Sequence, residues 1–170
     1  MKNGLLIILL LFVQGVSHAQ DPEFPAKEFI LHLRLQSGMV TRFNASPELF
    51  TGSVQLVPQV TLIPNRVRVG IIAGGFYTAN KLQGAFGPTV SVKLVSLSLK
   101  NFGSGGNIHL AVDHLWGSGG QRLLGGGFYA DLLNRIVIGT AIHRDYRLGS
   151  WWWQGSIAFR VSRVKRIEQP

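Results

Sequence analysis

The stretch Trp151–Arg163, WWWQGSIAFRVSR, alternates between two kinds of side chain. One set of alternate positions is apolar or small: Trp151, Trp153, Gly155, Ile157, Phe159 and Val161. The other set is mostly polar: Trp152, Gln154, Ser156, Ala158, Arg160 and Ser162. Successive side chains of a β-strand point to opposite faces, so this period predicts a strand with one apolar and one polar face.

Seven earlier stretches alternate in the same way, which predicts an all-β chain of eight strands. With the last stretch, they cover about residues 28–36, 53–63, 66–77, 86–99, 107–116, 121–132, 135–146 and 151–163. Pro58 predicts a bulge or a local break in its strand, because proline has no N–H to donate to the ladder. At Leu94–Val95 the apolar residues change from even-numbered to odd-numbered positions. An extra residue inserted there would keep all of them on one face of the sheet, so a second bulge is predicted.

The connections are predicted from turn-forming residues. They are a polar loop from about residue 38 to 47, tight turns at Pro64-Asn65 and Leu133-Asn134, a loop through Asn80 and Lys81, and glycine-rich turns at 101–106 and 117–120.

The segment before the first strand has the three parts of a secretory signal peptide. It combines a positive start at Lys2, an apolar run over Leu5–Val13 and the small-x-small sequence Ser17-His18-Ala19. The run is too short to cross a bilayer as a helix, which needs roughly 20 residues. The predicted organisation is a signal peptide (1–19), a periplasmic leader (20–27), a barrel (28–163) and a basic tail (164–170).

Composition excludes several classes of protein. The chain has no cysteine, which rules out disulfides and thiolate metal sites. Its net charge is +9, yet only 15% of residues are charged and 46% are hydrophobic. A nucleic-acid-binding domain is expected to be more charged and to cluster its basic residues, so no nucleic-acid partner is predicted.

The make-up of the two faces predicts which one is inside. The polar face is rich in Gly, Ala, Ser, Gln and His with a few charges, which suits a narrow lumen better than a surface in water. The apolar face is nearly free of charge, which suits lipid. The alternative is a soluble calycin-like barrel that points its apolar residues inward and binds a small ligand.

Aromatic residues of the apolar phase collect at the two ends of the strands. If the N-terminus is periplasmic, odd strands run outward and even strands return. The predicted aromatic girdle then comprises, at the outer end, Tyr77, Phe86, Trp116, Tyr146, Trp151 and Trp153, and, at the periplasmic end, Phe29 and Phe159.

In this pattern the chain resembles the small eight-stranded outer-membrane proteins of Gram-negative bacteria, of the OmpX-like or OmpA-barrel type. The resemblance covers about residues 28–163 and lies in the alternation and the girdle. It implies an antiparallel up-and-down transmembrane barrel that the barrel-assembly machinery folds. The family usually ends its last strand on a C-terminal aromatic residue, whereas here Phe159 is followed by a tail that ends at Pro170.

Charged residues of the polar phase are the candidate functional residues. We expect a lumen charge network of His32, Arg34, Arg66, Arg68, Lys93, His109, Asp113, Asp131, Arg135, His143, Asp145 and Arg160. Buried charges must be paired, so a structural network of ion pairs is the main interpretation. Four arginines map to the periplasmic end, where they stay hydrated or bind an anion: Arg66, Arg68, Arg135 and Arg160.

Other chemistry has weaker signals. A lipid-modifying acyl-transfer or deacylation enzyme would use His143 and Asp145, but no serine has a suitable position. Neither a metal site nor a cofactor is predicted. Basic residues near the outer end would contact lipopolysaccharide phosphates or remain solvated: Arg42, Lys81, Arg122, Arg144 and Arg147. The predicted role is therefore structural or interactive: membrane integrity, lipopolysaccharide contact, or a place in an envelope complex beside a protein partner.

Overall fold

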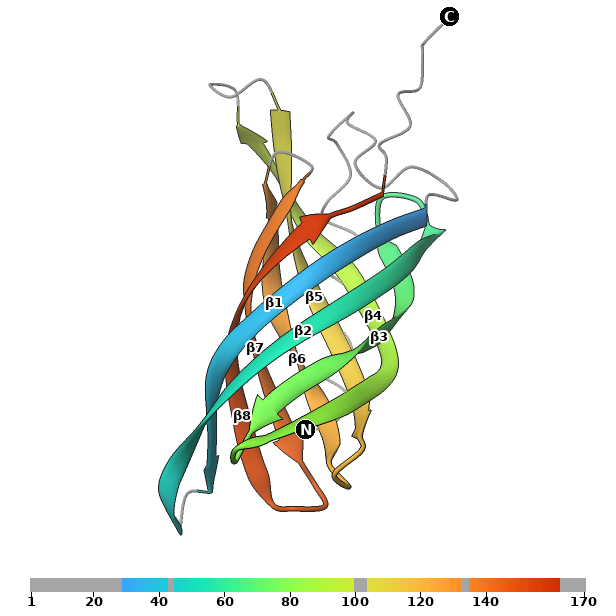
Figure 1. Ribbon diagram of the computed structural model, residues 1–170. Coiled ribbons are helices and arrows are strands. Elements are labelled where there is room, and N and C mark those ends of the chain that lie inside the picture. Colours follow the sequence, from blue (N-terminus) through green and yellow to red (C-terminus); the bar gives the residue numbers. More distant parts are fainter. Residues whose placement is uncertain (1–28, 43–44, 100–103, 133–134, 163–170) are drawn as a thin grey trace, which may run out of the picture.

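Eight antiparallel strands form a closed barrel in the computed structural model, which describes residues 29–42, 45–99, 104–132 and 135–162 (Figure 1). They are β1 (Phe29–Arg42), β2 (Ala45–Ile63), β3 (Val67–Thr78), β4 (Lys81–Leu99), β5 (Ser104–Gly117), β6 (Arg122–Leu132), β7 (Ile136–Asp145) and β8 (Ser150–Arg160). Each strand pairs with its neighbours in sequence, and β1 also pairs with β8, so the sheet has no free edge. The predicted all-β up-and-down barrel is confirmed. Among the described residues, no helix is long and apolar enough to cross a bilayer.

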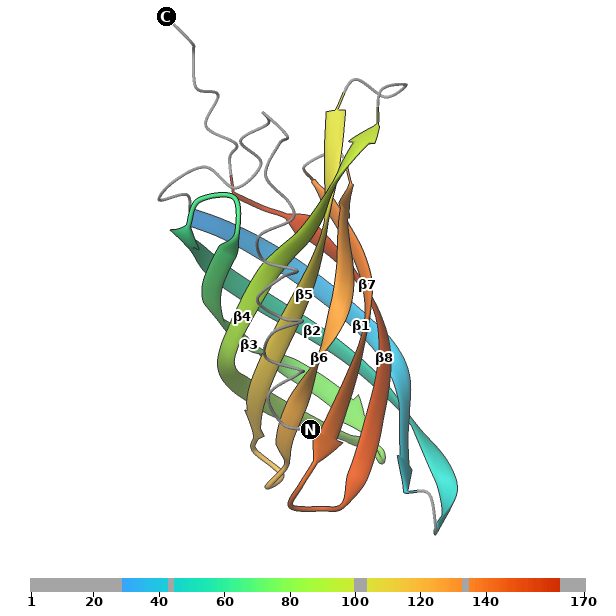
Figure 2. The same cartoon turned by 180° about the vertical axis from the view of Figure 1, so that it is seen from behind.

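The two ends of the barrel differ in their connections. The proximal end, at the top of Figure 1, holds the start of β1, the end of β8 and the β2–β3, β4–β5 and β6–β7 connections. The distal end holds the β1–β2, β3–β4, β5–β6 and β7–β8 connections. Seen from behind, β4 and β5 extend beyond the other strands at the proximal end (Figure 2).

The alternation assigns side chains to the two faces as the sequence predicts. On β1, Arg34 is 5% exposed and faces the lumen, whereas the next residue, Leu35, is 42% exposed on the outer wall. The same alternation of buried and exposed side chains runs along the other strands. Polar and charged side chains therefore fill much of the interior, and large apolar side chains cover the outside, which is the reverse of a soluble barrel.

The irregularities of the strands follow the predictions in part. The β4–β5 register shifts between Lys93 and Val95, which makes Leu94 the extra residue of the predicted bulge. At Pro58 there is a local break in place of a bulge: the β2–β3 pairing has no pair at Val57 and Pro58, and it resumes in the same register from Leu56↔Ala73 to Gln59↔Gly70. The missing N–H of the proline is accommodated without an inserted residue.

The loop predicted for residues 38–47 is wrong. β1 continues to Arg42, β2 begins at Ala45, and pairs such as Met39↔Phe50 extend the hairpin. Gly38 marks a close approach of two strands and no turn, because a Cβ at this position would collide with the carbonyl oxygen of Trp153.

The connection predicted through Asn80 and Lys81 is present but shorter than predicted, because it is a two-residue turn and Lys81 already belongs to β4. Thr78 pairs with Lys81, and the two residues between them have positive φ angles, 50° at Ala79 and 60° at Asn80. Two successive positive φ angles suit the twist of a tight hairpin. β4 consequently begins at Lys81, earlier than predicted.

Some predictions fall on residues that the structure leaves undescribed. These are the signal peptide (1–19), the leader (20–27), the turn at Leu133-Asn134 and the tail (164–170). Of the glycine-rich segment 101–106, the described part, from Ser104, belongs to β5.

Candidate functional site

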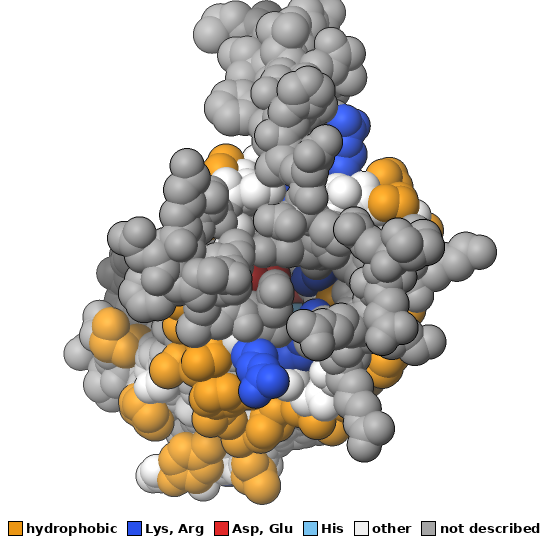
Figure 3. All heavy atoms as spheres, turned by 90° about the horizontal axis from the view of Figure 1, so that it is seen from above, with side chains coloured by type: hydrophobic (Ala, Val, Ile, Leu, Met, Phe, Trp, Pro, Cys, Tyr) orange, Lys and Arg blue, Asp and Glu red, His pale blue; other side chains and the backbone are white. Residues whose placement is uncertain are grey.

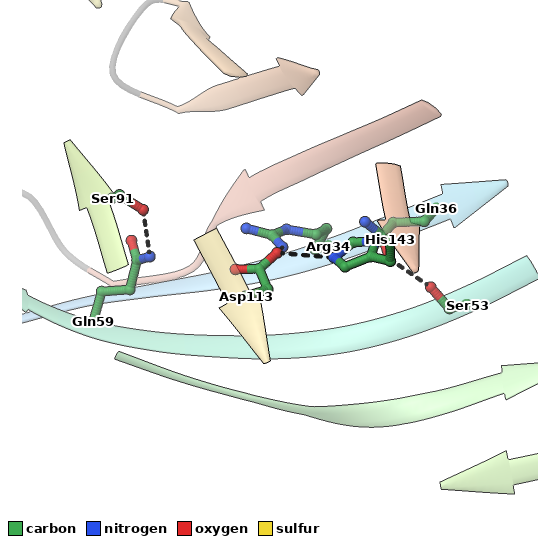
Figure 4. Close-up of polar contacts among 7 residues, drawn as sticks. All are labelled: Arg34, Gln36, Ser53, Gln59, Ser91, Asp113 and His143. Carbon is green, nitrogen blue, oxygen red and sulfur yellow. Dashed lines mark hydrogen bonds and ion pairs between the residues drawn. The ribbon is translucent and has the colours of Figure 1, made fainter. Parts of the chain in front are cut away.

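A buried charge cluster from β1, β5 and β7 lies in the middle of the lumen. Arg34 Nη1 is 4.0 Å from Asp113 Oδ2, and His143 Nε2 is 3.4 Å from the same oxygen (Figure 4). The Arg34 guanidinium also lies over the ring of Tyr129, 4.8 Å from its centroid. A carboxylate buried to this degree is stable only beside a compensating charge, so Asp113 links Arg34 and His143 across the lumen.

A second charge cluster lies nearer the proximal end. Asp131 Oδ2 is 3.6 Å from Arg68 Nη1, and its Oδ1 is 3.6 Å from His109 Nδ1. His109 stacks on Tyr129 with ring centroids 5.5 Å apart, which connects this cluster to the central one. A small cavity beside Asp131 is lined by His32, Arg68, Arg135 and Arg160. The view onto the proximal end shows acidic and basic side chains inside the ring of strands (Figure 3).

Uncharged polar side chains bridge strands inside the lumen, from β1 to β2 and from β2 to β4. Ser53 Oγ donates to Gln36 Oε1 at 3.0 Å, and Gln59 Nε2 donates to Ser91 Oγ at 3.3 Å (Figure 4). Each bond satisfies buried groups that would otherwise be costly away from water. The lumen is thus a cross-linked polar interior for much of its length.

The distal part of the lumen holds a buried apolar cluster, called the plug below, which the alternation alone does not predict. Phe76 and Trp152 meet edge to face, with ring centroids 5.2 Å apart and an interplanar angle of 85°. The plug consists of Val40, Val57, Ile72, Phe76, Ala85, Leu115, Leu123 and Trp152. Its signal in the sequence is a set of bulky apolar residues in the polar phase of their strands.

The predicted lumen residues occupy three kinds of position. Those buried in the lumen are His32, Arg34, Arg68, His109, Asp113, Asp131, His143 and Asp145. Lys93 and Arg160 are half-buried. Arg66 and Arg135 are exposed in proximal turns. Arg66 differs from its predicted lumen position because the β2–β3 turn takes three residues, Pro64–Arg66, and its amide donates to the Ile63 carbonyl at 3.1 Å.

The eight predicted girdle residues lie outside the lumen, either exposed or half-buried. They are, distally, Tyr77, Phe86, Trp116, Tyr146, Trp151 and Trp153, and, proximally, Phe29 and Phe159. His114 joins the distal set: its ring is 4.6 Å from Trp116, and its Nε2 is 3.0 Å from Tyr146 Oη. On the distal wall, the rings of Phe86, Trp116, His114 and Tyr146 therefore form one contacting group.

His143 and Asp145, the candidate residues for acyl-transfer or deacylation chemistry, contact different partners. His143 contacts Asp113 in the central cluster. Asp145 Oδ1 accepts backbone N–H groups of Arg147 and Leu148, each at 3.0 Å, and so holds the β7–β8 turn. Both side chains face inward, away from the outer wall. Among the described residues, no group of three or more His, Asp or Glu side chains has a geometry that could hold a metal ion.

Comparison with known proteins adds information on the fold. No protein-family model matches the sequence. No curated protein matches it. The chain is similar to a solved structure described as "De novo design of transmembrane beta-barrels", with a TM-score of 0.51 and 12% sequence identity. The match covers 85% of this chain and 100% of that one. The two chains share the barrel architecture.

Proposed function

We propose that the chain is an integral β-barrel of a bacterial outer membrane, with a structural or interaction role in the cell envelope. One observation carries the proposal: the carboxylates Asp113, Asp131 and Asp145 are buried in the lumen, whereas large apolar side chains remain exposed around the wall. Soluble proteins rarely expose an apolar surface of this extent, but hydrocarbon stabilises it.

The strands have lengths that suit this environment. The shortest, β7, has 10 residues, and β6 and β8 have 11 each. A tilted membrane strand needs about 9–11 residues to cross the hydrocarbon. The exposed aromatic rings at the distal and proximal ends then lie at the two bilayer–water interfaces.

The lumen favours a structural role over transport. The plug places buried apolar side chains in the distal lumen, and the charge clusters bind the strands to one another. An eight-stranded barrel has an interior just wide enough for its own side chains. The lipid-modifying alternative has less support, because His143 and Asp145 both face inward.

The proposal extends to export and partners. Residues 1–19 would direct export to the periplasm, and the barrel-assembly machinery would insert the strands. Basic residues at the distal end, such as the exposed Arg147, would face lipopolysaccharide phosphates. A protein partner in the envelope would dock from either aqueous side.

Cell fractionation with gel electrophoresis tests the location and the fold together. We expect the protein in the outer-membrane fraction, with the unboiled sample migrating faster than the boiled one, because a closed hydrogen-bonded barrel resists detergent until it is heated. A cytosolic protein and a known outer-membrane barrel serve as fractionation controls. A soluble periplasmic protein whose mobility is the same before and after boiling would contradict the proposal.

Removal of the plug is expected to open the lumen. The double variant Phe76→Ala/Trp152→Ala should raise the ion conductance of planar bilayers at least about tenfold over the wild type, because the side chains that fill this narrow interior are gone. Phe86→Ala, which truncates an exposed ring on the outer wall, is the control and should leave conductance unchanged. Equal conductance of the double variant and the wild type would show that the plug is not the barrier.

A further inference from the structure

The outer wall of the distal end carries an open cleft of about 780 Å³. It lies where β4, the β5–β6 hairpin and the β7–β8 turn meet. Its chemistry comes from two aromatic rings, a hydroxyl, a turn carbonyl and two guanidinium groups: Phe86, Trp116, Ser118, Gly120, Arg122 and Arg147.

The cleft is positively charged. Arg147 Nη1 donates to the Gly120 carbonyl oxygen at 3.4 Å, which holds its guanidinium over the β5–β6 turn. The carboxylate nearest in sequence, Asp145, is fully buried, and its Oδ1 accepts the backbone N–H groups of Arg122 and Arg147 at 3.3 and 3.0 Å. Within the described part of the chain, no ion pair joins the guanidinium of Arg122 or Arg147 to a carboxylate. Charge complementarity therefore calls for an anion.

A hydroxyl group completes the set of donors. The Gly84 amide donates to Ser118 Oγ at 3.0 Å, which fixes the oxygen and leaves its O–H to donate to a ligand. Two guanidinium groups and one hydroxyl match the several acceptor oxygens of a phosphate group, to which arginine binds through paired hydrogen bonds.

The aromatic rings place this anion site at the level of lipid headgroups. Phe86 and Trp116 form one wall, with ring centroids 5.4 Å apart, and Phe86 is 60% exposed. Exposed aromatic rings of membrane barrels collect at the interface between hydrocarbon and water. Resting on the membrane location given above as the proposed function, we propose that the cleft binds the phosphate-bearing headgroup of a membrane lipid, whose chains lie along the apolar wall.

Lipid titration of the folded, detergent-solubilised protein, followed by native mass spectrometry, tests the site. Dimyristoyl phosphatidic acid is the probe, and dimyristoylglycerol, which lacks the phosphate, is its matched control. We expect the phosphate lipid to bind at least about tenfold more tightly than the neutral one, as charge-assisted contacts require. Arg122→Gln/Arg147→Gln should abolish most of this preference.

Lys81→Gln/Arg144→Gln is the matched control variant. It removes equally many positive charges from exposed residues at the same end, outside the cleft. Its affinity for the phosphate lipid should change by less than about twofold, since unspecific attraction to exposed charges is weak and screened. An equal loss in both double variants would overturn the proposal in favour of diffuse surface charge. Displacement of the lipid by equimolar inorganic phosphate would overturn it in favour of a site for free phosphate.

Gel mobility of unboiled samples separates the failure of this site from the failure of the proposed function. A wild type that shows no heat-dependent shift contradicts the membrane barrel itself, whereas a shifted wild type without phosphate preference contradicts only the cleft. If Arg122→Gln/Arg147→Gln does not fold, Ser118→Ala decides, with an expected loss of about threefold for one hydrogen bond. Unchanged affinity in Ser118→Ala would then count against the site.

Discussion

The variant Asp113→Ala is expected to lower the free energy of unfolding by about 3–5 kcal/mol, because it leaves a buried cation without its paired carboxylate. Asp113 is 1% exposed and is the carboxylate that faces both Arg34 and His143. Without it, the Arg34 guanidinium stays in the lumen beside the ring of Tyr129, and no other carboxylate among the described side chains forms an ion pair with it. Urea unfolding of protein folded into phospholipid vesicles, followed by tryptophan fluorescence, measures the loss.

The double variant Arg34→Met/Asp113→Ala is the control for this interpretation. Because it removes the charge of both partners, its unfolding free energy should exceed that of Asp113→Ala alone. Additive losses in the double variant, or a loss below about 1 kcal/mol in Asp113→Ala, would show that the pair is hydrated and of little consequence.

The strands and their faces were predictable because the alternation of side chains is a local property. The phase flip at Leu94 is local as well, and it located the bulge. Strand ends were harder to predict, since a glycine signals either a turn or a close approach of two backbones. Gly38 predicts part of a loop, yet it lies within β1 against Trp153 of β8, a contact that depends on the register of the closed barrel.

The candidate site was predictable as a set of inward charges but not as an arrangement. Asp113 meets Arg34 and His143 from three different strands, and such contacts depend on the stagger of the barrel, which no single strand encodes. The plug had a signal, since Phe76 and Trp152 are bulky apolar residues in polar phases. Arg66 is exposed in the proximal turn and not in its predicted lumen position, because the turn is one residue longer than predicted.

Val112→Arg is expected to cost about 2–4 kcal/mol of unfolding free energy in phospholipid vesicles, the penalty for a cation on the lipid-facing side near the bilayer midplane. Val112 is 51% exposed on the outer wall and pairs with Val90 and Gly126 of the neighbouring strands. If the wall contacts hydrocarbon, the guanidinium has no water within reach, and the carboxylates among the described side chains, Asp113, Asp131 and Asp145, are buried in the lumen. The urea assay used for Asp113→Ala measures the change.

Leu82→Arg is the matched control at a different depth. Leu82 is 79% exposed and lies at the distal end, next to the β3–β4 turn, where an arginine reaches water and lipid headgroups. The same change there should cost about 0–1 kcal/mol. A depth-dependent penalty of this kind requires a lipid-embedded wall, whereas a barrel surrounded by water would tolerate arginine at Val112 and Leu82 equally. Equal and small losses at the two positions would therefore contradict membrane insertion, and with it the reason for the exposed apolar surface.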